Sequence, residues 1–341
     1  MIIIRPIAKK DLGIFAEFSF ESMLGITSLS RDRGKLEEKI ILSENSFIKE
    51  VKWPASEEYY FVLEDLTTSR IGGICGILAQ NRTEQSSFYK IENISTNASH
   101  ISAPKEMKVL RVVTRSEKSS EICSLYLQPT FRHSGQGRLL SLSRFLFIAA
   151  HKNRFEKKIL AELRGVIDQR QISPFWEEIG RHFCRLSFVE LMAQIDQDRT
   201  FIKEILPKFP LYIDLLPKNV QGVIGKTHES TKPALHMLVN EGFVFKGEID
   251  SFDGGPLLTA PTNSIRTVKN SALVQIRKTD ELLTEENEYL LSNDHLEQFR
   301  ACFGRLKFIS KNEAFIHDKV AESLLINNGE KVRYVSIHSL N

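Results

Sequence analysis

Residues 121–153 constrain the fold of this chain more than any other stretch of its 341 residues. The segment begins with an almost wholly apolar run, residues 122–127, which predicts a short strand buried on both faces. Pro129 ends this strand, because proline cannot donate to a sheet ladder. From Arg138 onward the apolar residues recur at helical spacing around most of the circumference. We therefore expect a strand, a loop and a deeply packed helix.

The loop between this strand and helix contains Arg132, Gly135 and Gly137 in the order Arg-x-x-Gly-x-Gly. The first amides of a helix lack intrahelical partners, and the helix dipole favours an anion there, so such a loop can bind phosphate. A tight turn that needs two glycines has the same pattern, and it is the preceding buried strand that favours phosphate binding. The residues expected at a coenzyme diphosphate are Arg132, Ser134, Gly135, Gln136, Gly137 and Arg138.

The composition is that of an ordinary globular protein, with 42% hydrophobic and 26% charged residues. A formal net charge of +3 is too small to indicate nucleic-acid binding. No apolar run approaches the about 18 residues that a membrane span needs, and we expect no membrane association. The four cysteines have no Cys-x-x-Cys spacing, which favours free thiols in a reducing cytoplasm over disulfides or a metal site.

The rest of the chain predicts a mixture of strands and helices. Strands are expected at residues 1–6, 59–64 and 71–79, with helices from Asp11 to about 23 and over 32–47. The polar stretch 80–118 is longer than a turn requires, and its alternating parts, 87–91 and 109–113, predict extra strands at a rim.

Two later segments follow the same order of cap, helix, glycine and strand. In the first, Ser173 caps a helix that ends at Gly180, and a strand follows at residues 182–188. Residues 158–167 before it predict a buried strand, and 189–225 after it are helical and irregular. The second copy is 230–245. The sequence alone leaves open which copy completes the sheet.

This order of elements resembles the GNAT superfamily of N-acyltransferases, in which a strand and a glycine loop bind acyl-CoA. More specifically, the chain resembles the bacterial arginine N-succinyltransferase family. The matching blocks include EICSLYL at 121–127, AELRGVID at 161–168, SPFW at 173–176, EGF at 241–243 and FDGGP at 252–256. The resemblance implies a cytoplasmic enzyme that transfers the succinyl group of succinyl-CoA to the α-amino group of L-arginine, and some members accept ornithine.

The resemblance also implies an α+β fold, with a GNAT-like mixed sheet and flanking helices. We expect residues 1–260 to form the acyltransferase domain, with insertions at about 80–118 and 189–225. Residues 261–341 are expected to form a small α+β appendage, with strands at 272–277 and 331–337 and a helix at 317–326. This appendage makes self-association into a homo-oligomer plausible.

Two site residues follow from the resemblance, Leu125 in the succinyl-CoA site and His228 as the proton donor. A strand that separates from its neighbour beside the coenzyme can offer the backbone amide of Leu125 to an oxyanion. His228 precedes a helix, whose positive end disfavours the imidazolium and keeps the ring neutral. Many GNAT enzymes use a tyrosine of the late helix as the acid, and here Trp176 or Leu238 stands at that place, which supports an acid elsewhere.

The two charged groups of the substrates also need partners. A guanidinium group requires a carboxylate, and the candidates are Glu121, Glu162, Asp168 and Asp253. For the succinyl carboxylate the candidates are Arg144, Arg164 and the pair Thr27-Ser28. Each of these residues could equally be an ordinary turn or rim residue.

Two alternatives remain at this stage. The chain could be an acyl-CoA-dependent acyltransferase that acts on ornithine or another amine, or with acetyl-CoA. It could also be a non-catalytic sensor that binds acyl-CoA. A comparison of acyl donors, and the effect of losing His228, would distinguish these alternatives from the enzyme.

Overall fold

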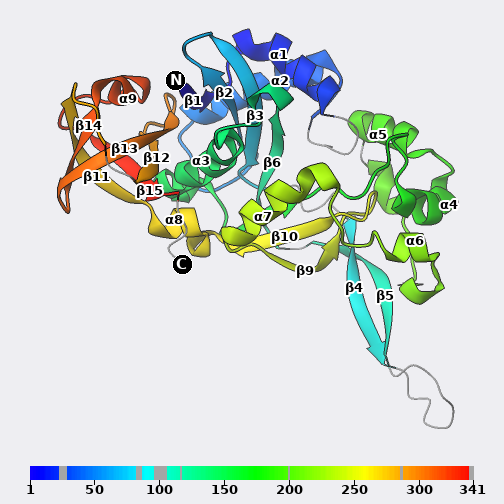
Figure 1. The fold of residues 1–341 in the computed structure, drawn as a ribbon. Helices are drawn as coiled ribbons and strands as arrows, with labels where there is room; N and C mark the ends of the chain where they lie inside the picture. The colour runs from blue at the N-terminus through cyan, green and yellow to red at the C-terminus, as the bar shows by residue number, and fades with distance from the viewer. Residues whose placement is uncertain are drawn as a thin grey trace.

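The computed structural model describes residues 1–22, 29–81, 87–95, 106–115, 117–198, 200–284 and 287–337. Its strands form one continuous 15-stranded sheet in the order β12-β15-β11-β14-β13-β1-β2-β3-β6-β7-β10-β9-β4-β5-β8 (Figure 1). Helices flank this sheet, and both parallel and antiparallel pairs occur in it. The expected α+β class with a mixed sheet is therefore confirmed.

The first part of the chain builds the centre of the sheet. Its elements are β1 (Ile2–Pro6), α1 (Leu12–Glu21), α2 (Arg33–Ile48), β2 (Glu58–Asp65), β3 (Arg70–Leu78), β6 (Ser120–Leu127), α3 (Gln136–Ala150) and β7 (Lys158–Glu162). Alternation along β2 separates two cores, because successive side chains of a strand point to opposite faces. Tyr59 and Phe61 pack in the cluster around α3, whereas Tyr60 and Val62 pack in the cluster of α1 and α2.

The helix predicted after Asp11 is present, but Asp11 does not cap it with its side chain. The carboxylate instead accepts hydrogen bonds from Arg5 at 2.7 and 3.0 Å and from the Ala8 amide at 2.9 Å. Arg5, which is mostly buried, and the helix amides compete for the Asp11 carboxylate. The ion pair with Arg5 is the stronger interaction. The helix after Asp32 has a side-chain cap, since Asp32 accepts the amides of Gly34 and Lys35.

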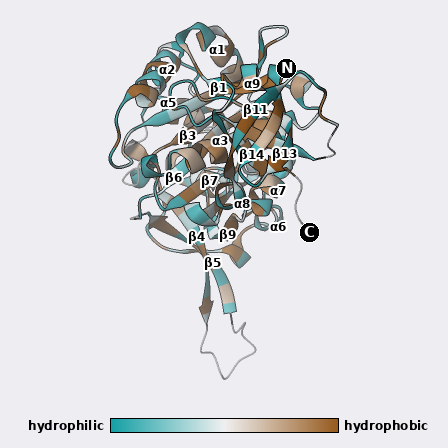
Figure 2. Cartoon of the chain, turned by 90° about the vertical axis from the view of Figure 1, so that its left-hand side faces the viewer, coloured by the Kyte–Doolittle hydropathy of each residue, from teal (hydrophilic) through white to brown (hydrophobic). Residues whose placement is uncertain are grey.

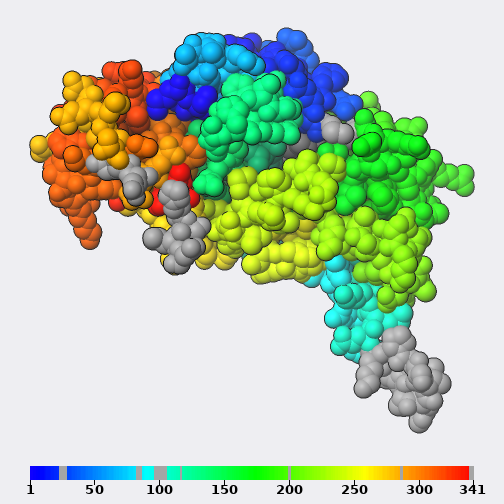
Figure 3. Space-filling view, in the orientation of Figure 1, coloured from blue at the N-terminus to red at the C-terminus, as the bar shows by residue number. Residues whose placement is uncertain are grey.

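The predicted insertion forms an arm that projects from the body of the molecule (Figures 1 and 3). β4 (Ser87–Ser95) and β5 (Glu106–Thr114) are antiparallel and paired along their whole lengths. β4 joins the sheet through β9, and β5 pairs with β8 (Leu211–Tyr212). The extra strands are thus confirmed, whereas residues 82–86, 96–105 and 116 of the insertion lie outside the described part of the chain.

The first of the two similar segments does not supply a strand. Its helix starts after Ser173, whose hydroxyl accepts the Trp176 amide at 3.2 Å, but it passes through Gly180 and ends with α4 (Arg181–Cys184). The strand predicted at 182–188 is therefore wrong. A capping box between Ser187 and Glu190 starts α5 (Phe188–Gln197) there instead.

The second copy completes the sheet. It consists of α7 (Lys232–Asn240), a left-handed turn at Gly242, and β9 (Val244–Ile249), which pairs with β10 (Pro256–Pro261) and β4. The short helix α6 (Lys218–Gln221) lies in the irregular stretch between the two copies. β7 is shorter than the predicted 158–167, because the chain leaves the ladder after Glu162 and crosses the turn around Asp253. A Cβ on Gly165 would meet the Asp253 carbonyl oxygen at 2.2 Å.

The C-terminal segment closes on itself. Its elements are α8 (Arg266–Asn270), β11 (Ala272–Thr279), β12 (Glu288–Ser292), β13 (Ala301–Ser310), β14 (Glu313–His317), α9 (Asp318–Ser323) and β15 (Lys331–Ser336). β12 pairs with both β13 and β15, so the strands of this segment close on one another around a core that also includes Ile3 of β1. Figure 2 shows β11, β13 and β14 side by side, with hydrophobic residues along them. The first and last strands and the helix were predicted, and β12, β13 and β14 were not.

The division of the chain into domains at residue 260 stays a prediction. β13 pairs with β1 through Ile4 and Ala301, so the two sheets are continuous. In the part of the chain that the structure describes, no helix combines the length and the apolar character needed to cross a membrane.

Candidate active site

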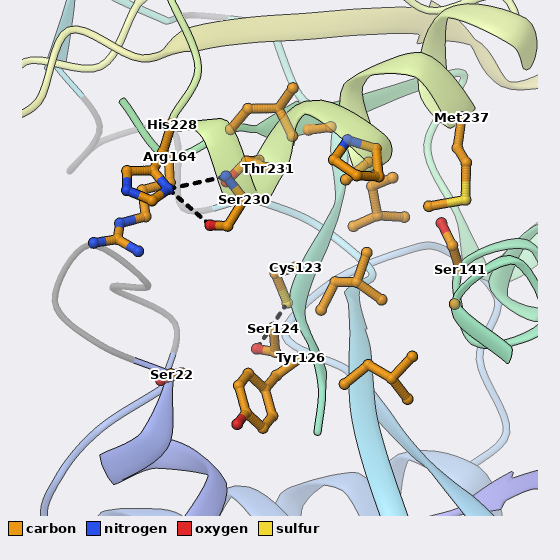
Figure 4. A pocket seen from close by; sticks show the side chains of 18 of the residues that line it. Ser22, Cys123, Ser124, Tyr126, Ser141, Arg164, His228, Ser230, Thr231 and Met237 are labelled. Atoms are coloured by element: carbon orange, nitrogen blue, oxygen red, sulfur yellow. Dashed lines mark hydrogen bonds between the residues drawn. The ribbon is translucent and has the colours of Figure 1, made fainter. Parts of the chain in front are cut away.

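A cavity of about 860 Å³ lies where β6 and β7 separate (Figure 4). Its wall is formed by the ends of these two strands, the loop before α3, the start of α5 and the helix α7. The lining includes Ser22, Glu121, Cys123, Leu125, Tyr126, Arg132, Gly135, Gln136, Gly137, Arg144, Glu162, Arg164, Met192, His228, Met237, Leu238 and Asp253.

The separation of the two strands opens the cavity. They are parallel over three residue pairs, from Ser120 with Ile159 to Ile122 with Ala161. Beyond Ile122, β6 continues without β7 and stays paired with β3 on its other side. β6 also bulges on its other side, because Tyr126 faces Ile74 and Cys123 faces Gly76, which leaves two residues opposite one. Such bulges re-aim the backbone beside active sites. Leu125 is one of the two bulged residues and lines the cavity, and the role of its backbone amide stays a prediction.

The glycine loop has the geometry of an anion cradle. Ser134 and Gly135 are both left-handed, with φ of 50° and 76°, and α3 begins directly after them at Gln136. Gly135 is the N-cap residue and gives no side-chain hydrogen bond to the helix amides. Of the first three amides of α3, that of Gln136 donates to the His133 carbonyl at 3.1 Å and that of Arg138 to the Gly135 carbonyl at 2.9 Å. Among the described residues the Gly137 amide has no such backbone partner, which leaves it for an anion, as is expected at a phosphate site. The five predicted residues 132 and 134–137 line the cavity.

The two arginines of the loop differ in position. Arg132 lines the cavity, and its Nε donates to the Leu127 carbonyl at 2.9 Å, which ties the loop to the end of β6. Arg138 is exposed and does not belong to the cavity wall. Its Nη1 lies 3.4 Å from the Ile337 carbonyl, at the side of the C-terminal segment. The structure thus brings Arg132, and not Arg138, to the cradle.

His228 lies on the opposite wall, where it caps the 3-10 turn Glu229–Thr231 that leads into α7 (Figure 4). Its backbone amide donates to the Arg164 carbonyl at 2.9 Å, which joins it to the segment after β7. Its Nδ1 accepts the Ser230 amide at 3.1 Å and lies 2.7 Å from the Ser230 hydroxyl. Because Nδ1 is the acceptor of a backbone N–H, this hydrogen-bond pattern assigns the proton of the neutral ring to Nε2.

The surroundings of His228 favour the neutral ring. Partial burial lowers its pKa below the usual value of 6.5, and the positive charge of Arg164 lowers it further. Glu229 and the Ile167 carbonyl act in the opposite direction. The sequence attributed the neutral ring to the helix dipole, whereas the structure adds burial and a neighbouring guanidinium. A neutral histidine can donate a hydrogen bond from Nε2 at physiological pH.

The four candidate carboxylates fall into two groups. Glu121 and Glu162, on neighbouring strands, both line the cavity, and Glu121 accepts a bond from the Asn81 side chain at 2.6 Å. Asp253 also lines it, but its two oxygens accept the amides of Gly165 and Gly255 at 2.7 and 2.8 Å. The Asp168 side chain accepts two backbone amides of its own turn. Asp253 therefore has the contacts of a turn-forming acid, and burial raises its pKa well above the usual value.

The candidate arginines also differ. Arg144 is fully buried inside α3 and donates to the Ser141 carbonyl, the Ser141 hydroxyl and the Cys123 carbonyl. Arg164 is half-buried beside His228, and its Nε and Nη2 are shielded without a hydrogen-bond partner among the described residues. Thr27 and Ser28, the third candidate site, lie outside the described part of the chain.

Sequence reasoning missed several cavity residues. The Tyr126 hydroxyl donates to Glu21 at 2.7 Å, and burial raises the pKa of this tyrosine. The bulge brings both Leu125 and Tyr126 to the cavity wall, and no pattern in the sequence indicated a bulge. Leu238 of α7 lines the cavity, whereas the Trp176 indole is buried elsewhere and donates to the Leu186 carbonyl at 2.8 Å. Among the described residues, no group of three or more potential ligands is placed to hold a metal ion.

Comparison with known proteins places this geometry in a family. The family model described as arginine N-succinyltransferase beta subunit matches residues 2–267, and the model of its C-terminal domain matches residues 272–336. An arginine N-succinyltransferase of Photorhabdus laumondii is 33% identical, over 99% of this chain and 98% of the relative, and one of Escherichia coli is 31% identical over the same shares. The solved structure of arginine/ornithine succinyltransferase subunit AI from Pseudomonas aeruginosa matches with a TM-score of 0.90 and 30% identity, over 99% of both chains.

Proposed function

Because the chain belongs to the arginine N-succinyltransferase family, we propose that it transfers the succinyl group of succinyl-CoA to the α-amino group of L-arginine. The products are N2-succinylarginine and CoA. One observation supports this most: β6 and β7 separate in front of a glycine loop whose helix amides face one cavity, and His228 stands on the opposite wall.

The coenzyme would lie along the separated strands. Its diphosphate would accept a hydrogen bond from the Gly137 amide at the positive end of α3, with the left-handed Ser134 and Gly135 allowing close approach. Arg132 would add a positive charge at the same end. The pantetheine arm would run beside the free edge of β6, and this places the thioester near the bulge. The amide of Leu125 would then stabilise the oxyanion of the tetrahedral intermediate.

The chemistry needs only the two substrates. The α-amino group, once deprotonated, attacks the thioester carbonyl carbon, and a C–N bond forms while the carbonyl becomes an oxyanion. Collapse of this intermediate breaks the C–S bond, and the proton lost from the amine is returned to the departing thiolate. His228 would assist by donating a hydrogen bond from Nε2 to this thiolate or to the oxyanion. Its Nδ1 is not available for this role, because it accepts the Ser230 amide.

The guanidinium of arginine would be recognised by carboxylates of the cavity wall. Glu121 and Glu162 occupy neighbouring strands and both face the cavity, so they supply negative charge where the amino acid enters. Asp253 would instead hold the Asp-Gly-Gly turn, because both of its oxygens accept backbone amides. Glu162→Gln is expected to raise KM for arginine about tenfold or more, which steady-state kinetics would measure.

The proposed activity is tested by release of free thiol. Purified protein with succinyl-CoA and arginine should release CoA, and mass spectrometry should identify N2-succinylarginine. Ornithine and acetyl-CoA, each substituted in turn, test the alternative acyltransferase. An acyl-CoA sensor would instead bind succinyl-CoA with no thiol release with any basic amino acid, and that result would contradict the proposal.

The cellular setting follows from the same proposal. Cys75, Cys123, Cys184 and Cys302 are all free, and three of them are buried, in keeping with a reducing cytoplasm. Self-association stays a prediction, which light scattering of the purified chain would measure.

A further inference from the structure

Three buried or half-buried arginines allow an internal comparison. Arg154 and Arg144 are structural, and both have several partners. Arg154 donates to the Ser46 and Lys49 carbonyls and to the Tyr59 hydroxyl, at 3.2, 2.7 and 2.9 Å. Arg144 donates to Ser141 and to the Cys123 carbonyl. These two guanidinium groups are therefore satisfied within the protein. Arg115, away from the cavity, has one shielded atom without a partner among the described residues, Nη1, but its Nη2 pairs with Glu248 at 2.6 Å.

Arg164 does not follow this pattern. Among the residues that the structure describes, its Nε and Nη2 have no hydrogen-bond partner although both atoms are shielded from solvent. Its side chain also forms no salt bridge there. Asp253 acts electrostatically on the pKa of Arg164, but the two Asp253 oxygens accept the amides of Gly165 and Gly255. A shielded N–H without an acceptor costs about 1–3 kcal/mol, and more for a charged group. Such a group in a native protein calls for an explanation, and a substrate is one.

The identity of the two atoms indicates the missing partner. Nε and Nη2 are on the same edge of the guanidinium plane, and their N–H bonds point in parallel. This is the donor pair that matches the two oxygens of one carboxylate in a bidentate contact. Arg164 is half-buried and lines the cavity, where a ligand can reach its side chain.

The location also fits a role in the reaction. The backbone carbonyl of Arg164 accepts the backbone amide of His228. Arg164 therefore both positions His228 and places its own guanidinium beside it (Figure 4). Arg164 follows β7 at the open end of the strand pair, where the acyl group and the amine would meet.

We propose that Arg164 is the carboxylate-binding residue of the active site, and that its Nε–Nη2 edge holds the carboxylate of a substrate. The inference rests on the proposed function, in which both substrates carry one: succinyl-CoA at the end of its acyl chain, and arginine beside the reacting amine. In either case Arg164 determines specificity, because an analogue without the carboxylate leaves the guanidinium unpaired.

Substrate analogues test the proposal and separate the two carboxylates. Butyryl-CoA has the length of succinyl-CoA with a methyl group in place of the carboxylate, and agmatine is arginine without its carboxylate. The variant is Arg164→Lys, which keeps the charge and loses the bidentate edge. Arg111→Lys is the control, since Arg111 pairs with Glu92 on the projecting arm at 2.8 Å. Circular dichroism and thermal melting check that both variants fold.

With succinyl-CoA and arginine, Arg164→Lys should lower kcat/KM about 10- to 100-fold, and Arg111→Lys should leave it unchanged. If the acyl carboxylate is bound, this loss disappears with butyryl-CoA and persists with agmatine. If the carboxylate of arginine is bound, the loss disappears with agmatine and persists with butyryl-CoA. An equal loss with every substrate pair, or no loss, would overturn the proposal.

Isothermal calorimetry measures ligand binding directly, so it tests the carboxylate site without relying on turnover. Wild-type protein should bind one carboxylate-bearing ligand, succinyl-CoA or arginine, more tightly than its analogue, and Arg164→Lys should abolish that difference. If thiol release fails but this difference is found, the proposed reaction is wrong and the carboxylate site stands. If thiol release succeeds and the variant keeps the full difference in both ligand pairs, the carboxylate site is wrong and the reaction stands.

Discussion

The strands that the structure describes include two parallel pairs, and they differ in how far the pairing extends. In the C-terminal segment, β11 and β14 are paired over five residues, from Gln275 with Glu313 to Thr279 with His317. Around the cavity, β6 and β7 share three pairs and then separate. In the first pair the backbone N–H and C=O groups form hydrogen bonds within the sheet. In the second pair one edge of β6 stays available to a ligand.

A histidine begins the helix that follows in both places. His317 ends β14 and caps α9, where its Nδ1 accepts the Lys319 amide at 3.2 Å. His228 follows an isolated bridge between Gly165 and Thr227, and its Nδ1 accepts the Ser230 amide at 3.1 Å. The local geometry is the same, and only His228 faces the cavity. Helix capping and proposed chemistry can therefore be separated experimentally.

The largest expected effect comes from replacing the two histidines by asparagine. Asparagine is a good N-cap, so His228→Asn and His317→Asn should each change the free energy of unfolding by no more than about 1 kcal/mol. His228→Asn should lower kcat/KM about 100-fold or more, because it removes the Nε2 donor. His317→Asn should leave kcat/KM unchanged. A His228→Asn enzyme within a few-fold of wild type would show that His228 is a cap only.

A second effect is expected from the coenzyme cradle. A Cβ on Gly137 would meet Leu127 at 3.7 Å, an ordinary contact, so Gly137→Ala fits the folded chain. The methyl group should nevertheless keep the diphosphate from the helix amides. KM for succinyl-CoA should rise about tenfold, the loss of one or two charged hydrogen bonds, with thermal stability unchanged or raised. An unchanged KM would place the diphosphate elsewhere.

The titration of His228 tests how Arg164 acts on it. The pKa of His228 is lowered, so the ring should be neutral at pH 7 and take up a proton only below about pH 6.5, which NMR of the imidazole would follow. Arg164→Met removes a positive charge that disfavours protonation, so the pKa of His228 should rise and its titration should move to higher pH. Arg164→Lys keeps the charge and should move the titration less. A titration at the same pH in both variants would contradict this electrostatic coupling.

The smallest effects concern two left-handed glycines, one from each region. Gly135 before α3 has φ of 76°, and Gly329 in the turn before β15 has φ of 85°. Alanine at either position should cost about 1–2 kcal/mol of stability, which urea denaturation would measure. Gly135→Ala should also raise KM for succinyl-CoA, and Gly329→Ala should not. Equal kinetics in the two variants would argue against a role for the cradle.

Local sequence predicted the cradle because its parts are neighbours in the chain. The apolar strand, the loop with Gly135 and Gly137, and the helix after it depend on contacts within about 30 residues, and the structure reproduces them as β6 and α3. The helix predicted over 32–47 is present as α2, and the helix after Ser173 begins where its cap predicted. The end of the second helix was wrong, because Gly180 is compatible with a helix and packs against the Trp176 ring.

Other features depend on partners far away in the sequence. The second copy, 230–245, completes the sheet because β9 pairs with β10 and β4. The first copy, 173–188, has no such pairing among the described residues. The bulge at Ser124 depends on the register with β3. Strands β12–β14 are defined by a closed set of pairings within the C-terminal segment.

The sequence by itself predicted the strand, glycine loop and helix of the proposed cradle, because apolar periodicity and glycine spacing are local features of the chain. The family-like blocks indicated the candidate histidine. Only the tertiary structure decided which candidates share the cavity. It set Asp253 into a turn, turned Arg138 away, and left the Nε–Nη2 edge of Arg164 without a protein partner among the described residues. The physical reason is that hydrogen-bond satisfaction is settled between segments far apart in the chain, and no local pattern records it.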